Sequence, residues 1–381
     1  MTQQDQALLG EAAQDALTFV VEPWPNAQAI SDLKSWTDLA LSASMPNPFF
    51  ERWALVPALK QFATDSAVLL AQLFDGDRLV GVMPVSIGRD YYGHPIPHVS
   101  TWLHHNAFCG TPLVATGYEL AFWTHLISWA DRASAMSPFL HLPKLPTDGS
   151  VHAALREALS LGARPAAIAE REERALLASE LGSEEYYTQS MTKKRRKELR
   201  RLHTRLAEQG DLQLVRQRGT AGLAEWIDAF LFLEKAGWKG QQGTSLADHS
   251  STTQFFRDAL TGAAESNRLE RLSFTLDGRP IAMLANFVTP PGVFSFKTTF
   301  DEDFARYSPG LLLQIDNLAL LDADGINWAD SCAAADHPMI ERIWREKREI
   351  VSVNVALGGS LRKTAMKVLA RLETGSFPKG I

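Results

Sequence analysis

Apolar residues that alternate with polar ones predict strands in both halves of the chain, and apolar residues three or four apart predict helices between them. The expected strands cover 17–22, 68–74, 78–87, 139–142, 175–178, 212–216, 269–276, 280–288, 293–299, 326–330 and 349–356. The expected helices cover 32–44, 48–62, 119–133, 151–161, 194–208, 221–236, 253–265, 310–323 and 339–344, and 93–112 is expected to be a loop. Asp75-Gly76-Asp77 and Asp277-Gly278 each separate two apolar runs, which is typical of β-hairpins. This mixture predicts an α/β fold with layers of both kinds.

The two halves also resemble each other. DGDRLVGVMPV (75–85) parallels LDGRPIAMLANF (276–287), and GTPLV (110–114) parallels SPGLLL (308–313). Two landmarks separated by the same distance of about 200 residues indicate a duplicated domain. We therefore expect tandem domains over 17–182 and 183–356, followed by a tail over 357–381.

Composition narrows the classes of protein. The chain has 381 residues, of which 45% are hydrophobic and 22% charged, enough for two cores. Two cysteines, Cys109 and Cys332, are too few for a disulfide framework and fit a reducing cytoplasm. Residues 1–16 lack the basic and apolar parts of a signal peptide, and no apolar run reaches the roughly 18 residues of a spanning helix. We expect a soluble cytoplasmic protein, with peripheral contact at the inner membrane left open.

Charge and missing motifs exclude several functions. The net charge of −6 disfavours a DNA-binding protein. Neither GxxxxGK[ST] nor GxGxxG occurs, which disfavours nucleotide hydrolysis and dinucleotide redox chemistry. Positive charge is concentrated in 193–205, KKRRKELRRLHTR, with eight Lys or Arg against Glu198. This segment is either a solvated helix face or a cradle for an anionic ligand.

The segment FSFKTTFDEDFARYSPGLLL (294–313) is a candidate phosphate site. An apolar strand is followed by a turn and an apolar helix, and free N–H groups at a helix start bind phosphate. Pro309 favours the first helical turn, Gly310 lets a diphosphate approach the backbone, and Arg306 can pair with a phosphate oxygen. The alternative is an ordinary turn capped by Ser308.

Four stretches of the second half carry a family resemblance: KKRRKELRRLHTRLAEQGDL, LEKAGWKGQQGTSL, SFKTTFDEDFARYSPG and DSCAAADHPMIERIW. They resemble the acetyltransferase domain of the CelD-like family, GNAT-fold proteins associated with bacterial cellulose and exopolysaccharide loci. NPFFERWALVPAL and GTPLV match the family more loosely. The chain is also similar to the FemAB aminoacyltransferases, which carry two GNAT-like domains in tandem. The resemblance implies two tandem GNAT-like domains, each a mostly antiparallel sheet flanked by helices.

The resemblance also implies a cofactor site. In GNAT folds the strand before the turn holds the pantetheine arm and the turn holds the pyrophosphate. Acetyl-CoA or another acyl-CoA would then lie at Arg306, Tyr307, Ser308, Pro309, Gly310 and Leu311, with no metal. The general GNAT turn reads Gln/Arg-x-x-Gly-x-Gly/Ala, whereas RYSPGL has a single glycine.

Acyl transfer needs a base for the acceptor and a donor for the oxyanion. The catalytic candidates are Glu234, Asp330, Asp301 and Lys297; the carboxylates could instead form caps, salt bridges or solvated surface. The candidate substrate contacts are Trp238, Lys239, Trp102 and His104. Cys332 is disfavoured as a nucleophile because GNAT enzymes usually attack directly. The histidines 94, 98, 104 and 105 lack the further ligands of a metal site.

These observations predict an acyl-CoA-dependent acyltransferase, an N-acetyltransferase acting on a saccharide or polysaccharide precursor, or on another small-molecule acceptor, in exopolysaccharide biosynthesis. The first, degenerate domain would supply substrate contacts. One alternative is a FemAB-like transferase using charged tRNA, with 193–205 as the RNA surface, although the long helical hairpin of that family is not visible. The other is a non-catalytic GNAT-shaped effector that regulates polysaccharide assembly.

The tail reads SLRKTAMKVLARLE over 360–373 and predicts a basic amphipathic helix. Its expected apolar face consists of Leu361, Ala365, Val368, Leu369 and Leu372. Such a helix docks on the protein's own core, lies on an anionic membrane, or binds an anionic regulator such as a cyclic dinucleotide. We expect it to lie outside the catalytic core.

Overall fold

The computed structural model describes residues 17–63, 67–375 and 381, so the 1–16 segment, for which no signal peptide is expected, lies outside the described residues. The chain forms two compact units. Unit 1 comprises Met1–Leu59, Ala63–Glu172 and Glu349–Ile381, and unit 2 comprises Lys60–Phe62 and Glu173–Arg348. This division differs from the sequence-based one, because the last strand and the tail belong to unit 1. Among the described residues, no helix combines the length and apolar character needed to cross a membrane.

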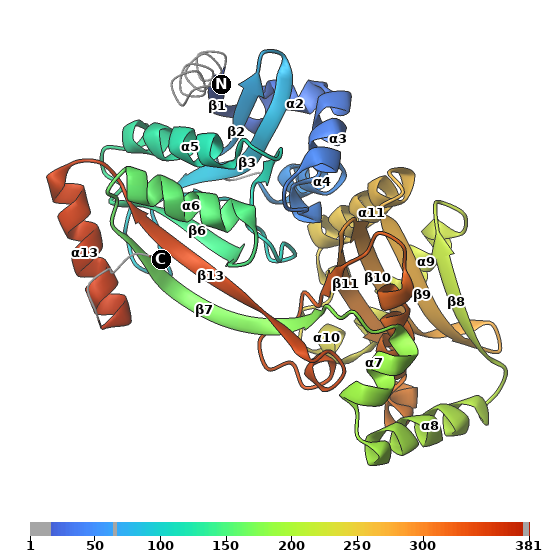
Figure 1. The fold of residues 1–381 in the computed structure, drawn as a ribbon. Coiled ribbons are helices and arrows are strands. Elements are labelled where there is room, and N and C mark those ends of the chain that lie inside the picture. Colours follow the sequence, from blue (N-terminus) through green and yellow to red (C-terminus); the bar gives the residue numbers. More distant parts are fainter. Residues whose placement is uncertain (1–16, 64–66, 376–380) are drawn as a thin grey trace, which may run out of the picture. The chain divides into compact units, whose positions relative to one another are not determined.

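The sheet of unit 1 has the strand order β1-β2-β3-β4-β6-β13-β7, with the two-residue β5 beside β3. Its strands are β1 (Leu17–Pro23), β2 (Val68–Asp75), β3 (Arg78–Gly88), β4 (His98–Thr101), β5 (Leu113–Val114), β6 (Phe139–Pro146), β7 (Ala166–Leu177) and β13 (Glu346–Ala356). Its helices are α2 (Gln28–Ser31), α3 (Leu33–Ser42), α4 (Arg52–Phe62), α5 (Glu119–Ala133), α6 (Ser150–Leu161) and α13 (Ser360–Thr374). The β4–β6 pair is parallel, whereas β1–β2, β2–β3 and β6–β13 are antiparallel. Figure 1 shows α5 and α6 side by side over this sheet.

The sheet of unit 2 has the order β7-β12-β11-β10-β9-β8. Its further strands are β8 (Leu212–Arg218), β9 (Leu269–Leu276), β10 (Arg279–Thr289), β11 (Gly292–Phe300) and β12 (Trp328–Asp330). Its helices are α7 (Ser183–Ser190), α8 (Lys193–Ala207), α9 (Leu223–Ala236), α10 (Trp238–Gln241), α11 (Ser250–Glu265) and α12 (Pro309–Asp316), with 3-10 turns η3 (Leu246–Asp248), η4 (Glu302–Tyr307), η5 (Asn317–Asp322) and η6 (Ile340–Arg342). The β11–β12 pair is parallel and β8 to β11 pair antiparallel. Each unit is thus a mostly antiparallel mixed sheet with helices, which confirms the predicted fold class.

Local chemistry explains the central hairpin of unit 2. Asp277 and Gly278 both have positive φ, as a tight primed turn between β9 and β10 requires. Aromatic side chains then fix helices on the sheet: Phe230 of α9 packs on Phe256 of α11, and Phe256 on Phe296 of β11. Burying such side chains removes large apolar areas from water, and this positions α9 and α11 against the strand that carries the candidate site.

The predicted repeat holds for its first landmark. Both hairpins exist, as β2–β3 and β9–β10. The second landmark does not coincide, because SPGLLL begins α12 whereas GTPLV leads into β5, and the corresponding helix α5 begins only at Glu119. The segment expected to be a loop contains the buried strand β4, and β7 is much longer than the expected strand over 175–178 because its charged residues also join the sheet.

Helix α13 docks on unit 1. Met366 and Ala370 are buried against a cluster that includes Tyr91 and Phe139. Of the predicted apolar face, Leu369 is partly buried against this cluster, whereas Leu361, Ala365, Val368 and Leu372 are exposed. The helix is therefore rotated relative to the expectation, and of the three uses considered for the tail, docking on the protein's own core is what the structure shows.

Candidate functional site

The parallel strands β11 and β12 separate soon after they pair. Gly292, Val293 and Phe294 pair with Trp328, Ala329 and Asp330. Two residues later, Cys332 adopts a positive φ of 51°, which non-glycine residues rarely do and which turns the chain away. In the described chain, β11 therefore continues to Phe300 beyond the end of β12, and we call the part of β11 after Phe294, which does not pair with β12, the opening.

A β-bulge lies at the start of this opening. Ala285 of β10 pairs with Lys297, but the next residue, Asn286, pairs with Ser295, so Phe296 is the extra residue on β11. A bulge takes main-chain groups out of the ladder and redirects the side chains beside it. The bulge therefore makes backbone groups available where β11 and β12 diverge.

The chain then enters the turn predicted to bind phosphate. Ser308 has a φ of 53° and makes no side-chain capping hydrogen bond to α12, so the Ser-capped alternative is not what forms. The amides of Leu311 and Leu312 both donate to the Ser308 carbonyl at 3.0 Å. Since Pro309 has no N–H, the Gly310 amide is the first-turn donor that, within the described residues, has no such backbone partner. This N–H lies at the positive end of the helix dipole, where an anion is stabilised.

The other predicted cofactor residues divide into two groups. Arg306 is exposed, and its guanidinium lies 4.7 Å from the Tyr307 ring centroid, so it is free to reach a ligand from the surface. Tyr307 and Leu311 belong to the hydrophobic core of unit 2, so they anchor the turn and offer a ligand at most their backbone. Gln314 ties α12 to β11 by donating to Ser295 and Thr298 hydroxyls at 3.4 and 3.2 Å.

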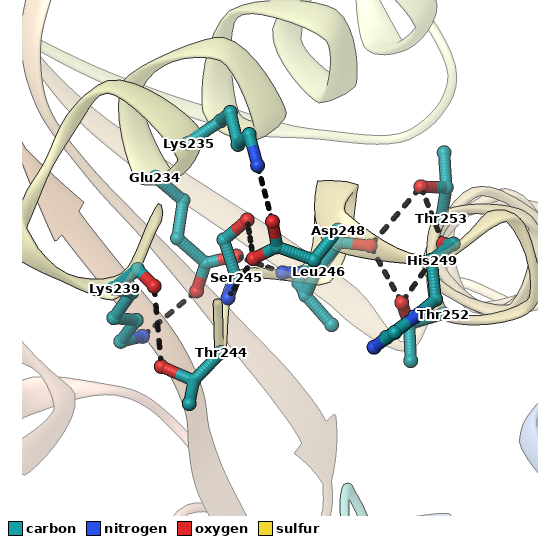
Figure 2. A network of polar contacts seen from close by, with 10 residues as sticks. All are labelled: Glu234, Lys235, Lys239, Thr244, Ser245, Leu246, Asp248, His249, Thr252 and Thr253. Atoms are coloured by element: carbon teal, nitrogen blue, oxygen red, sulfur yellow. Dashed lines mark hydrogen bonds and ion pairs between the residues drawn. The ribbon is translucent and has the colours of Figure 1, made fainter. Parts of the chain in front are cut away.

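Glu234 and Lys239 form an ion pair at the junction of α9 and α10 (Figure 2). The Glu234 side chain is almost fully buried, and its carboxylate accepts from Lys239 Nζ at 2.8 Å and from the Leu246 amide at 2.7 Å. The loop that follows Lys239 is fixed by a capping box, in which Ser245 and Asp248 bond reciprocally. The glycine-rich segment is thus an ordered support for one buried carboxylate.

Lys297 follows the bulge residue on β11 and lies close enough to the Glu234–Lys239 ion pair to feel both charges. The pKa of Lys297 is lowered to about 8, chiefly by burial and then by the neighbouring charge of Lys239, while Glu234 and Cys332 oppose the shift. Its Nζ also lies 5.6 Å from the Phe296 ring centroid. The structure therefore groups three predicted residues, Glu234, Lys239 and Lys297, where β11 diverges from β12.

The remaining carboxylates have structural partners. Asp330 is fully buried, 2.9 Å from Arg174 Nε and 3.3 Å from Arg348 Nη1, and accepts from the Cys332 amide. Both carboxylate oxygens are thus engaged by buried structural partners, so the geometry gives Asp330 a structural role. Asp301 caps η4 by accepting from the Asp303 amide and pairs with Arg279, which makes it a positioning group for the turn.

The predicted substrate contacts lie in different units. In unit 2, Trp238 is 49% exposed beside Lys239, whose Nζ is 6.0 Å from the indole, so it presents an apolar surface next to the ion pair. In unit 1, Trp102 is buried and tilted against His104 at 5.8 Å. His98 stacks on Phe139 and bonds to the Ile96 carbonyl. The described residues contain no group of three or more His, Cys, Asp or Glu side chains suited to hold a metal ion.

Unit 1 has the same strand–helix–strand crossover, in which α5 connects the parallel strands β4 and β6. Here the helix start is occupied by the chain itself, because Glu119 accepts from the Gly117 amide at 2.8 Å and from the Ser150 hydroxyl at 3.1 Å. Beside β6, Gly110 approaches so closely that an added Cβ would lie 2.0 Å from the Pro143 carbonyl oxygen. A carboxylate of the chain itself therefore occupies the start of α5, where the helix dipole favours negative charge.

Comparison with known proteins agrees with this geometry. Residues 193–338, which contain the bulge, the turn and the ion pair, match the family model of the acetyltransferase (GNAT) domain. The sequence matches no curated protein. The chain therefore carries the domain of a GNAT acyltransferase, a class whose members use acyl-CoA as donor.

Solved structures extend the likeness in fold to both units. FemX has a TM-score of 0.56 at 9% identity, over 88% of this chain and 98% of that one. The C-terminal domain (DUF2156) of a candidate lysylphosphatidylglycerol synthetase from Agrobacterium fabrum has a TM-score of 0.54 at 12% identity, over 92% and 99%. A conserved protein of unknown function from Bacteroides thetaiotaomicron has a TM-score of 0.54 at 11% identity, over 86% and 97%. At these identities the likeness concerns the fold alone.

Proposed function

We propose that unit 2 transfers an acyl group from acyl-CoA to an amine. The observation that carries the proposal is the coincidence of three features in the stretch that matches the GNAT domain: the opening after Phe294, the bulge at Phe296 and the turn at Gly310. The pantetheine arm lies along β11 in the opening, and the diphosphate lies at the Gly310 amide with Arg306 beside it.

In this proposal Lys297 is the general base. An acceptor ammonium must lose a proton before its nitrogen attacks the thioester carbonyl, and a base works best when its pKa lies near the working pH. The pKa of about 8 meets that condition. Lys297 takes the proton that the ammonium loses, and the neutral amine attacks the thioester carbonyl. When the tetrahedral intermediate collapses to the amide, the carbon–sulfur bond breaks, and the coenzyme A thiolate takes up the second amine proton and leaves as the thiol. Backbone N–H groups at the bulge stabilise the carbonyl oxygen as it becomes negative.

The charges of Glu234 and Lys239 adjust the pKa of Lys297. Lys239 adds positive charge that favours neutral Lys297, and Glu234 fixes Lys239 by their hydrogen bond. Trp238 offers an exposed aromatic face to the acceptor, as aromatic rings do for sugar rings. We propose an amino sugar of a polysaccharide precursor as acceptor and acetyl as the acyl group. Support for the saccharide comes from the resemblance of the four quoted motifs to the CelD-like family.

The test measures release of coenzyme A thiol from acetyl-CoA with a panel of amino sugars and, separately, simple amines. We expect turnover that Lys297→Met lowers by about 10²–10⁴-fold, the usual contribution of a general base, while acetyl-CoA binding measured by calorimetry is kept. Turnover unchanged in Lys297→Met would remove Lys297 from the mechanism. No binding of any acyl-CoA to the wild-type chain would remove the proposed function.

A further inference from the structure

The basic helix α8 carries a charge excess that the proposed reaction does not use. It has eight Lys or Arg against Glu198 between residues 193 and 205, and most of these cations are exposed. Its apolar side is short: Leu199 and Leu206 enter the core that also contains Tyr307 and Leu311. Packing one apolar side of a helix does not require so dense a cluster of like charges on the other side, because these charges repel one another. The opposite side is therefore a candidate binding surface.

Contacts place α8 beside the two elements that flank the cofactor turn. The helix packs against both η4 and α12. Near its end, His203 interacts electrostatically with Asp316, the last residue of α12. Because the end of α8 is near the end of α12, we infer that the contacts of α8 with η4, which precedes α12, come from its earlier turns.

Several cations lie close together near the start of α8, and one of them has a buried N–H group without a hydrogen-bond partner among the described residues. Burial raises the pKa of the Tyr187 hydroxyl, and the charges of Arg200, Arg196 and Arg195 oppose this shift, so the three guanidinium groups lie in the neighbourhood of Tyr187. The Arg196 Nε is buried, and among the described residues it has no hydrogen-bond partner. A buried guanidinium N–H without an acceptor is costly, and an anion supplies the missing acceptor. The exposed Lys193, Lys194 and Lys197 surround the same end.

We propose that the first two turns of α8 bind the 3′-phosphate of coenzyme A. This inference rests on the proposed function, which puts the diphosphate at Gly310. The ribose that follows the diphosphate carries the 3′-phosphate outward to the surface next to the turn, and that surface is α8. A doubly charged phosphate fits a cluster of guanidinium and ammonium groups. The turn has a single glycine and few free amides, so α8 supplies positive charge that the turn itself lacks.

The experiment compares coenzyme A with dephospho-coenzyme A, which lacks only the 3′-phosphate, by calorimetry on the full chain. We expect the wild-type protein to prefer coenzyme A by about tenfold or more, the size of a charged hydrogen bond. Arg196→Ala and Arg200→Ala should each reduce this preference without weakening dephospho-coenzyme A. The matched control is Arg205→Ala, an exposed arginine near the other end of the same helix, which should keep the preference.

The outcomes separate the two proposals. Equal affinity of the wild-type chain for both ligands overturns the α8 site and leaves the proposed function intact, and this needs no variant to fold. Binding of neither ligand overturns the proposed function. A preference that survives Arg196→Ala and Arg200→Ala also overturns the α8 site, as does a wild-type chain whose α8 instead binds tRNA in a salt-dependent manner without any preference for coenzyme A.

Discussion

Lys239 donates a hydrogen bond to Glu234 across 2.8 Å, and both charges act on Lys297 in opposite directions. The glycine-rich loop that contains Lys239 follows α9, whereas Lys297 lies on β11, far along the chain. Burial lowers the pKa of Lys297 most, and the ion pair adjusts the pKa of this residue, which only the fold brings near it.

The pH dependence of turnover follows from this arrangement. As a base, Lys297 must be neutral, so kcat/KM should rise with pH through about 8 and then level off. Lys239→Met removes a like charge, which raises the pKa of Lys297 and moves the rise to higher pH. Glu234→Gln removes a charge that favours the protonated form, which lowers the pKa and moves the rise to lower pH. Shifts of both profiles in the same direction would contradict the assignment.

The cofactor turn should tolerate no acidic side chain at its glycine. Gly310→Asp places a carboxylate beside the Gly310 amide at the start of α12, where it competes with the diphosphate. We expect loss of coenzyme A binding in calorimetry with a near-normal melting temperature. Gly310→Ala is the control for size, because its Cβ would lie 3.1 Å from Phe300 Cδ1 and requires only a small shift. If the aspartate variant binds as tightly as the alanine variant, the diphosphate lies elsewhere.

Asp330 should matter for stability. It is fully buried between Arg174 and Arg348, and its removal leaves two guanidinium groups without their counter-charge. Asp330→Asn is expected to lower the free energy of unfolding by about 3–5 kcal/mol, measured by denaturant titration. The comparison is Asp228→Asn, whose pair with Arg257 is exposed and should contribute about 0–1 kcal/mol. Equal losses of unfolding free energy in the two variants would show that the buried ion pair contributes no more to stability than the exposed one.

Much of the fold was predictable because its signals are local. The Asp277-Gly278 hairpin and the helix over 119–133 depend on neighbouring residues, and both occur where expected. The buried strand β4 was missed because it has only four residues next to prolines and histidines. The charged middle of β7 was missed because alternation is lost there.

The site was predictable in part for the same reason. RYSPGL is a contiguous motif, so its turn could be located from the sequence. The bulge at Phe296 depends on the register between β10 and β11, and the neutralisation of Asp330 depends on two arginines more than 15 residues away in either direction. No short-range pattern encodes such relationships. Arg196 is part of a basic block in the sequence, but the packing of that block against η4 and α12 follows from the tertiary fold.

The last prediction concerns α13, whose two faces should respond differently to mutation. Met366 is 1% exposed within the unit 1 cluster, so Met366→Ala leaves a cavity and should cost about 2–5 kcal/mol of unfolding free energy. Leu361 and Leu372 are 85% and 78% exposed, so their alanine variants should stay within about 0.5 kcal/mol of the wild type. A chain ending at Gly359 should then melt well below the full chain, because it lacks the helix that packs on Tyr91 and Phe139. Binding of the tail to an anionic membrane stays a prediction, and the exposed stripe is the part that would make it. Liposome sedimentation of Leu361→Glu/Leu372→Glu separates the two roles, because this variant should keep its melting temperature and lose any membrane binding. If Met366→Ala is as stable as the exposed-face variants, α13 contributes nothing to the core of unit 1.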